Sequence, residues 1–144
     1  MNVKYRKAEI DDMSEILDIL NGVSGDVEDA KPKQFLVAED GNRIIGCVRI
    51  KNVGGYSLAA SLAVLPNYRK KGIGTTLIEK IMKEDIKKPV YLFSNKKNEE
   101  FYKKFGFEIV ETEDLPEAIK EEYDDLLNKN FGGRTDLLIA MIID

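Results

Sequence analysis

Three patterns meet without a linker in the segment VLPNYRKKGIGTTLIEK, residues 64–80. The apolar run SLAASLAVL enters this segment and stops before Pro66, which cannot donate a hydrogen bond to a β-ladder and therefore ends a strand. Two glycines follow, and Leu77, Ile78 and Ile81 then recur at the spacing of a helix with one apolar face. A strand that turns directly into a helix predicts a layered fold in which helices pack on a sheet.

The rest of the chain alternates strand and helix patterns in the same way. Alternating or apolar runs predict strands at VKYRKA, QFLVAED, RIIGCVRIK, PVYLFSN, FEIVE and TDLLIAMIID. A capping box of Asp12 and Glu15 predicts the start of a first helix, and later helices are expected within NEEFYKKFGF and DLPEAIKEEYDDLLN.

Turn residues separate these elements. Turns are expected at Asp40-Gly41-Asn42, at NVGGY and at Gly132-Gly133, and a loop is expected over residues 21–33. The resulting order predicts one α/β domain, or α+β by some schemes, over residues 1–144, with a mixed sheet and helices on both faces.

Composition limits the partners and the compartment. A net charge of -4 argues against nucleic acid as the main partner, because binding it normally requires a basic surplus. No stretch approaches 18 consecutive apolar residues, and the N-terminus MNVKYRKAEIDD has no apolar core of a signal peptide. We therefore expect a cytoplasmic protein that does not bind a membrane.

The chain contains no histidine, which limits the chemistry of any active site. A Ser-His-Asp triad, a Cys-His pair and an HExxH zinc site are all excluded, and no metal site is expected. The single cysteine, Cys47, is therefore expected to be a core residue rather than a nucleophile.

The turn after Pro66 has the features of an anion site. The first N–H groups of a helix point at one spot, where the helix dipole adds about half a positive charge. Gly72 and Gly74 would let a phosphate approach the backbone, and cations on the same turn add charge: Arg69, Lys70 and Lys71. The alternative is a plain turn with solvated cations, and spacing alone does not separate the two. The ATP-binding pattern GxxxxGK[ST] is absent, and the dinucleotide pattern GxGxxG would need a glycine at Leu77.

Two segments resemble the signature motifs of the GCN5-related N-acetyltransferase (GNAT) family. VLPNYRKKGIGTTLIEKIM is similar to the acetyl-CoA signature [Q/R]-x-x-G-x-[G/A], whose defining positions are Arg69, Gly72 and Gly74. NEEFYKKFGF is similar to a second family segment, represented here by Asn98, Tyr102 and Gly106-Phe107. YRKAEIDDMSEILDI also resembles the first strand and helix of the family. A weaker likeness links GFEIVETEDLPEAIKEEYDDL to small amino-acid N-acetyltransferases of the N-acetylglutamate synthase type.

The resemblance implies a GNAT-like domain, with its sheet splayed between strands 4 and 5, that uses acetyl-CoA as acyl donor. Its pantetheine arm would pair with backbone near Leu62 and Val64, and Asn98 would bond the arm from the other side. Tyr102, with an unperturbed pKa of about 10, would protonate the departing thiolate; its alternative role is a core aromatic. The coenzyme A pyrophosphate would be held by the turn and the first helical residues: Arg69, Lys70, Lys71, Gly72, Ile73, Gly74 and Thr75.

One position departs from the family pattern. Many members carry a glutamate on the fourth strand as the general base, and Ala60 stands at that position here. Ser61 is too weak a base to replace it, although it could hold a water. An α-amine, with an unperturbed pKa of about 7.7–8.0, needs a base less than a lysine ε-amine with a pKa of about 10.4.

We therefore expect an N-acetyltransferase that moves acetyl directly, in a ternary complex, to a primary amine of an amino acid, another small amine or a peptide α-amine. The alternative is a non-catalytic acyl-CoA-binding module that has lost its base. Because dimers are common in the family, a homodimer is a further possibility. Candidates for clamping an acceptor carboxylate are Arg49, Lys51 and Arg134, each with a solvated surface charge as the alternative. The acidic helix from Glu117 to Asp125 fits either a cationic acceptor or a solvated face.

Overall fold

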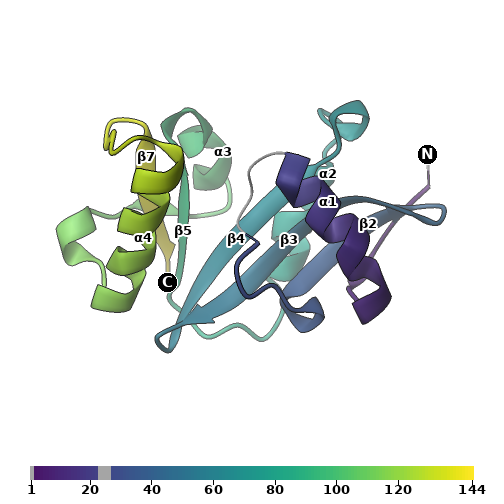
Figure 1. Cartoon of the computed structure of the whole chain (residues 1–144), viewed down its shortest axis with the longest axis horizontal. Helices are drawn as coiled ribbons and strands as arrows, with labels where there is room; N and C mark the ends of the chain where they lie inside the picture. Colours follow the sequence, from purple (N-terminus) through teal and green to yellow (C-terminus); the bar gives the residue numbers. More distant parts are fainter. Residues whose placement is uncertain (1, 23–26) are drawn as a thin grey trace. The chain divides into compact units, whose positions relative to one another are not determined.

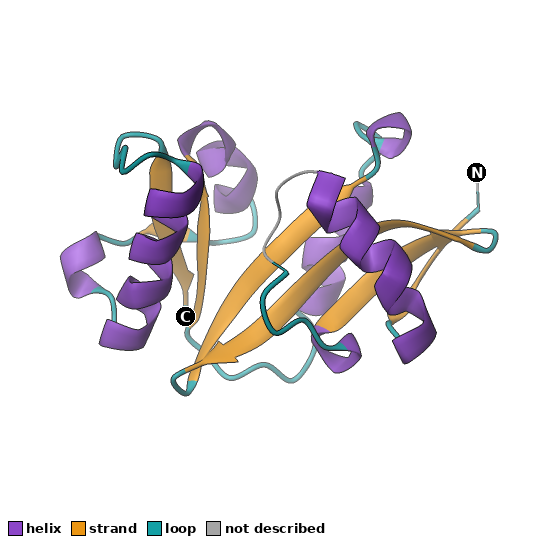
Figure 2. Cartoon of the chain, in the orientation of Figure 1, coloured by secondary structure: helices purple, strands orange, loops and turns teal. Residues whose placement is uncertain are grey.

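The structure is a computed structural model that describes residues 2–22 and 27–144. Strands and helices follow in the predicted order (Figures 1 and 2). The elements are β1 (Val3–Lys7), α1 (Met13–Gly22), β2 (Phe35–Asp40), β3 (Arg43–Val53), β4 (Tyr56–Val64), α2 (Ile73–Ile81), β5 (Val90–Asn95), α3 (Glu99–Lys103), β6 (Glu108–Ile109), α4 (Glu117–Asn130) and β7 (Leu138–Ile143). Most of the expected loop at 21–33 lies in the described chain and contains a 3-10 turn over Pro32–Gln34, while residues 23–26 lie outside the described residues.

The described strands form one seven-stranded sheet in the order β1-β2-β3-β4-β5-β7-β6. The β1-β2, β2-β3, β5-β7 and β6-β7 pairs are antiparallel, whereas β4 and β5 are parallel. The parallel register joins Ser57–Ala59 to Val90–Leu92. The predicted mixed, mostly antiparallel sheet is confirmed.

The chain divides into two compact units, and β4 runs through both. The first unit consists of the chain up to Ile50 together with Ala60–Asp85. The second consists of Lys51–Ala59 together with Ile86–Asp144.

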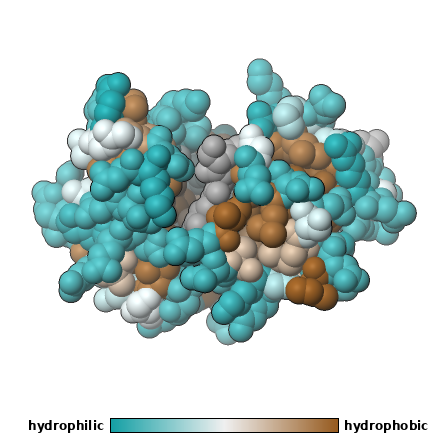
Figure 3. All heavy atoms as spheres, in the orientation of Figure 1, coloured by the Kyte–Doolittle hydropathy of each residue, from teal (hydrophilic) through white to brown (hydrophobic). Residues whose placement is uncertain are grey.

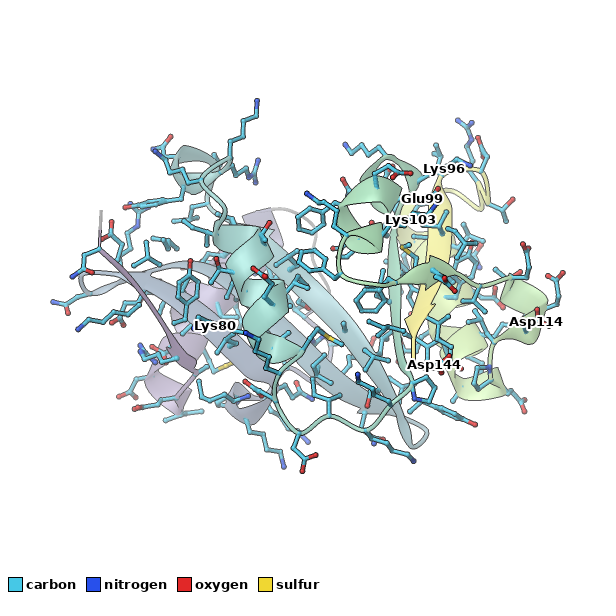
Figure 4. All side chains as sticks on the ribbon, turned by 180° about the vertical axis from the view of Figure 1, so that it is seen from behind. Lys80, Lys96, Glu99, Lys103, Asp114 and Asp144 are labelled. Atoms are coloured by element: carbon cyan, nitrogen blue, oxygen red, sulfur yellow. The ribbon has the colours of Figure 1, made fainter. Side chains whose placement is uncertain are left out.

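In the first unit, α1 and α2 cover opposite faces of the sheet, as Figure 1 and the reverse view of Figure 4 show. The α1 face packs against β2, β3 and β4, and this core contains Ile16, Ile19, Leu20, Phe35, Val37, Cys47 and Ala63. On the other face, Gly46 of β3 permits a close approach of its neighbours. A Cβ there would lie 3.1 Å from the Ala63 carbonyl oxygen and 3.3 Å from Leu77 of α2.

In the second unit, α4 packs on the strands through one apolar stripe. The core contains Leu58, Tyr91, Ile119, Tyr123, Leu127, Leu138 and Ala140. The Tyr123 hydroxyl donates a 2.7 Å hydrogen bond to the Leu138 carbonyl, which ties α4 to the start of β7. Hydrophilic side chains cover the outer face of α4 in Figure 3, as expected for a solvated acidic helix face.

One local prediction was wrong, and one predicted strand is shorter than expected. Asp12 does not open α1: it lies in a 3-10 turn, Ile10–Asp12, where its carboxylate accepts the Glu9 N–H at 2.7 Å. Glu15, the other half of the predicted box, instead accepts the Ile44 N–H at 2.9 Å. The strand predicted at FEIVE is only Glu108–Ile109 long, although the Val110 N–H still donates to Ala140 at 3.0 Å. A β-edge this short contributes little ladder energy.

Within residues 2–22 and 27–144, none of the helices combines the length and apolar character needed to cross a bilayer. The same part of the chain holds no cluster of three or more His, Cys, Asp or Glu side chains suited to a metal ion.

Candidate active site

The turn from β4 into α2 leaves a set of backbone donors facing away from the helix. The first helical hydrogen bond runs from Thr76 N–H to the Gly72 carbonyl at 3.0 Å. The N–H groups of Ile73, Gly74 and Thr75 precede it and therefore have no partner within the helix. The N-cap residue, Gly72, has no side chain with which to cap this terminus and adopts the left-handed conformation with φ 80°. This is the backbone geometry of a helix terminus that binds anions.

The cations on this turn differ in where they point. The side chains of Lys70 and Lys71 are exposed. Arg69 folds back instead, because its Nε donates to the Val64 carbonyl at 2.9 Å and its backbone N–H donates to Pro66 at 3.3 Å. Arg69 therefore ties the turn to the end of β4 while remaining exposed and charged beside the two lysines.

Tyr68 anchors this turn to the β2-β3 hairpin. Its hydroxyl donates a 2.9 Å hydrogen bond to the Asp40 carboxylate, and this bond raises the pKa of Tyr68. The backbone of Tyr68 also closes the 3-10 turn Pro66–Tyr68 by donating to Leu65 at 2.9 Å. Sequence reasoning missed this contact, because no local pattern connects two residues 28 positions apart.

The strand leading to this turn contains an irregular residue. Ser61 has φ 59°, a left-handed conformation, in the middle of β4. The Arg49 Nε donates to its hydroxyl at 3.0 Å, and the Cys47 thiol donates to its carbonyl at 3.5 Å. The predicted pantetheine-pairing residues, Leu62 and Val64, follow directly and are half-buried.

Cys47 is completely buried, as predicted for a core residue. Burial raises the pKa of its thiol to about 12, so the thiolate that a nucleophile needs is scarce at neutral pH.

The three candidate carboxylate clamps have protein partners in the described structure. Arg49 is 0% exposed, so the surface alternative was wrong for it, and Lys51 is only 8% exposed and faces Glu122 at 3.8 Å. Arg134 is exposed and pairs with Asp136 at 2.6 Å.

The second motif lies in the second unit, at the start of α3. Asn98 is exposed and immediately precedes the helix, and Tyr102 follows one turn later. Glu99 and Lys103 form a 2.6 Å ion pair along the helix, labelled in Figure 4. This pair steadies a helix of five residues that could not persist alone.

Tyr102 is set among aromatic rings. Its ring makes edge-to-face contacts with Phe101, at 5.0 Å between centroids, and with Phe107, at 6.3 Å. Desolvation raises the pKa of Tyr102 to about 12. The hydroxyl therefore keeps its proton at any physiological pH, and the half-buried ring packs against its aromatic neighbours.

Comparison with known proteins identifies the family. Residues 31–109 match the acetyltransferase (GNAT) domain. The uncharacterized N-acetyltransferase CT2212 of Chlorobaculum tepidum is 32% identical over 130 residues, which cover 79% of this chain and 81% of that protein.

Solved structures share the fold at lower identity. N-acetylglutamate synthase from Neisseria gonorrhoeae, complexed with coenzyme A and N-acetyl-glutamate, is 19% identical with a TM-score of 0.75. The match covers 100% of this chain but only 36% of the synthase chain. An Arabidopsis thaliana protein, complexed with the bisubstrate analogue CoA-Ac-MVNAL, is 17% identical with a TM-score of 0.63, and the match covers 100% of this chain and 99% of that one.

The chain belongs to the GNAT family of acetyltransferases. It is an acyltransferase whose acyl donor is acetyl-CoA, and the predictions of family, fold, enzyme class and donor are confirmed.

Proposed function

We propose that a single catalytic domain over residues 1–144 moves acetyl from acetyl-CoA to the primary amine of an amino acid, another small amine or a peptide α-amine. The neutral amine attacks the thioester carbonyl while both substrates are bound. The C–N bond forms, the C–S bond breaks, and coenzyme A leaves as a thiol. No covalent acetyl-enzyme intermediate forms.

One observation carries the placement of the donor: the N–H groups of Ile73, Gly74 and Thr75 precede the first helical hydrogen bond of α2, and Gly72 has no side chain to cap them. Pyrophosphate suits this terminus because it brings two negative groups to the helix dipole, with Lys70 and Lys71 exposed beside it. The pantetheine arm then runs along the backbone at Leu62 and Val64, and Asn98 is proposed as a further contact of the arm. The Val64 carbonyl already accepts Arg69, and a carbonyl oxygen has two lone pairs, so a donor on the arm can share it.

Tyr102 serves the leaving sulfur as a hydrogen-bond donor. A free thiol has a pKa of about 8.5, so handing over the proton of a group with a pKa near 12 is uphill by roughly 5 kcal/mol. A donated hydrogen bond needs no such transfer and still stabilises the charge that develops on sulfur. The proton that finally converts the thiolate to a thiol then comes from the attacking nitrogen.

Ala60 bears on the choice of acceptor, because it stands where many family members carry a glutamate that acts as general base. Without a carboxylate there, an amine that is partly neutral at pH 7 reacts more readily, which favours an α-amine over a lysine side chain. The synthase bound to N-acetyl-glutamate and the Arabidopsis protein bound to CoA-Ac-MVNAL both support an amino-acid or peptide acceptor.

The test replaces the Tyr102 hydroxyl. Acceptors are first found by screening amino acids, amines and peptides for acetyl-CoA-dependent thiol release. Tyr102→Phe should then lower kcat by about 10²-fold, the usual cost of losing one hydrogen-bond donor to developing charge, while the Kd for acetyl-CoA stays within twofold.

Tyr56→Phe is the matched control, because Tyr56 is an exposed tyrosine whose loss leaves the proposed site untouched. Wild-type turnover in Tyr102→Phe, or a burst of acetyl-enzyme with acetyl-CoA alone, would contradict the proposal.

A further inference from the structure

Ser61 holds a conformation that its residue type does not favour. With φ 59° inside β4, it places a side-chain-bearing residue in the region that glycine adopts most readily. Such a residue persists only where its surroundings compensate, and it redirects the strand beyond it. The residues it redirects are Leu62 and Val64, on which the proposed pantetheine contact depends.

Two residues of the neighbouring strand β3 contact Ser61, one at its hydroxyl and one at its carbonyl. Arg49 Nε donates to the Ser61 hydroxyl at 3.0 Å, and the Cys47 thiol donates to the Ser61 carbonyl at 3.5 Å. The arginine contact is the stronger of the two, because its donor is charged and Arg49 is completely buried.

Arg49 is itself fixed by the segment before β2. Its Nη1 donates to the Glu28 carbonyl and to the Gln34 side-chain oxygen, each at 3.2 Å. Its guanidinium carbon lies 5.5 Å from the centre of the Phe35 ring. A side chain so constrained presents Nε to Ser61 in one orientation, and its burial gives an acceptor carboxylate no access to it.

We infer that Arg49 is a positioning residue for acetyl-CoA: through Ser61 it fixes the left-handed turn that directs the backbone of Leu62 and Val64 toward the pantetheine arm. The inference rests on the proposed function. If Ser61 relaxed to an extended conformation, the following peptide groups would rotate and the donor and acceptor offered to the arm would turn away. The N–H groups of Ile73, Gly74 and Thr75 at the start of α2, which we call the phosphate cradle, would keep their own geometry.

Two substitutions at Ser61 separate backbone conformation from hydroxyl chemistry. Ser61→Ala and Ser61→Gly both remove the acceptor of Arg49, but only glycine adopts φ 59° without strain. Ser61→Ala should raise the Kd for acetyl-CoA by about tenfold, and Ser61→Gly by no more than about threefold. The Kd for 3′-phosphoadenosine 5′-diphosphate, which has no pantetheine, should stay within twofold of wild type in both variants.

Arg49→Met should act like Ser61→Ala, and adding Ser61→Gly should restore most of the affinity for acetyl-CoA. The inference would be overturned if Ser61→Ala and Ser61→Gly raised the Kd for acetyl-CoA equally, or if Ser61→Ala left that Kd unchanged. It would also be overturned if Ser61→Ala weakened the binding of acetyl-CoA and of 3′-phosphoadenosine 5′-diphosphate equally. The comparison of Ser61→Ala with Ser61→Gly tests the inference even if Arg49→Met does not fold. A wild-type chain that binds neither ligand would overturn the proposed function first, and the inference with it.

Discussion

Lys70 shares the left-handed conformation of Ser61 but has a different reason for it. It has φ 63° on the exposed turn before α2, where the chain must reverse within a few residues to bring the cradle donors forward. The left-handed region costs an L-residue about 1–2 kcal/mol, and only glycine avoids this cost. A lysine at this position therefore lowers the stability of the fold but places a cation beside the helix terminus.

Replacing Lys70 by glycine tests both effects. Lys70→Gly should raise the free energy of unfolding by about 0.5–1 kcal/mol, the strain relieved less the extra freedom of glycine in the unfolded chain. It should also weaken acetyl-CoA binding, because a cation is lost. Urea denaturation measures the first effect and calorimetry the second.

Lys71→Gly is the control, because Lys71 is the next residue along and has no positive φ. It should lose a comparable amount of binding but also lose about 0.5–1 kcal/mol of stability. Equal stability changes in the two variants would show that Lys70 is not strained.

At the scale of elements, Arg6 fastens β1 to its surroundings. Its guanidinium contacts both carboxylate oxygens of Asp12, at 2.7 and 2.9 Å, and Glu39 of β2 at 2.7 Å. Asp12 is mostly buried and also accepts the Glu9 N–H, so it is held from two directions. These contacts join the edge strand, the 3-10 turn before α1 and the second strand.

The Arg6 hydrogen bond lowers the pKa of Asp12 below its ordinary value, and this sets a pH dependence. Because the pKa is lower in the folded state, the pair stabilises the protein fully above the unfolded pKa of about 3.9 and loses this effect as pH falls toward the folded pKa. Asp12→Asn should therefore lower the free energy of unfolding by about 1–2 kcal/mol at pH 7. The difference in unfolding free energy between the variant and wild type should narrow below about pH 4.

Urea denaturation between pH 3 and 7 checks the dependence. Asp11→Asn removes an exposed carboxylate from the same turn and should change the stability by less than about 0.5 kcal/mol throughout. If the difference in unfolding free energy between Asp12→Asn and wild type stayed constant with pH, the charge of the Asp12 carboxylate would not contribute to stability.

At the scale of the whole molecule, the order of elements was predictable because each one carries its own periodicity and turn residues. Gly41 and Gly106 stand where the chain needs positive φ, and Pro66 stands where β4 ends. The cradle before α2 was predictable for the same reason, since all its parts lie in one short segment.

Contacts between distant parts of the chain were not predictable. Tyr68 with Asp40, and Arg49 with Ser61, join positions 28 and 12 residues apart that no local pattern links. The turn at Ser61 was hidden because serine in an apolar run resembles any strand residue, whereas glycine would have indicated it. Asp12 fitted the first position of a capping box, but its carboxylate accepts the Glu9 N–H and so closes the preceding 3-10 turn instead.

The last prediction concerns which elements the donor contacts. The proposed function assigns the pyrophosphate to the start of α2 and the sulfur to Tyr102 of α3. Acetyl-CoA should therefore slow amide hydrogen exchange both at residues 73–76 and at residues 99–103. 3′-Phosphoadenosine 5′-diphosphate should slow exchange only at residues 73–76, because it lacks the pantetheine arm that would reach α3.

Mass spectrometry of exchange at matched fractional saturation measures this. A ligand at about 100 times its Kd stabilises the folded chain by about 2.7 kcal/mol, and this slows every amide that exchanges only through global unfolding. The informative amides are those that open locally, and the outer turns of α4 serve as the control, with no change expected from either ligand. If both ligands protected only residues 73–76, α3 would not take part in binding the donor, and the role of Tyr102 at the sulfur would fall with it.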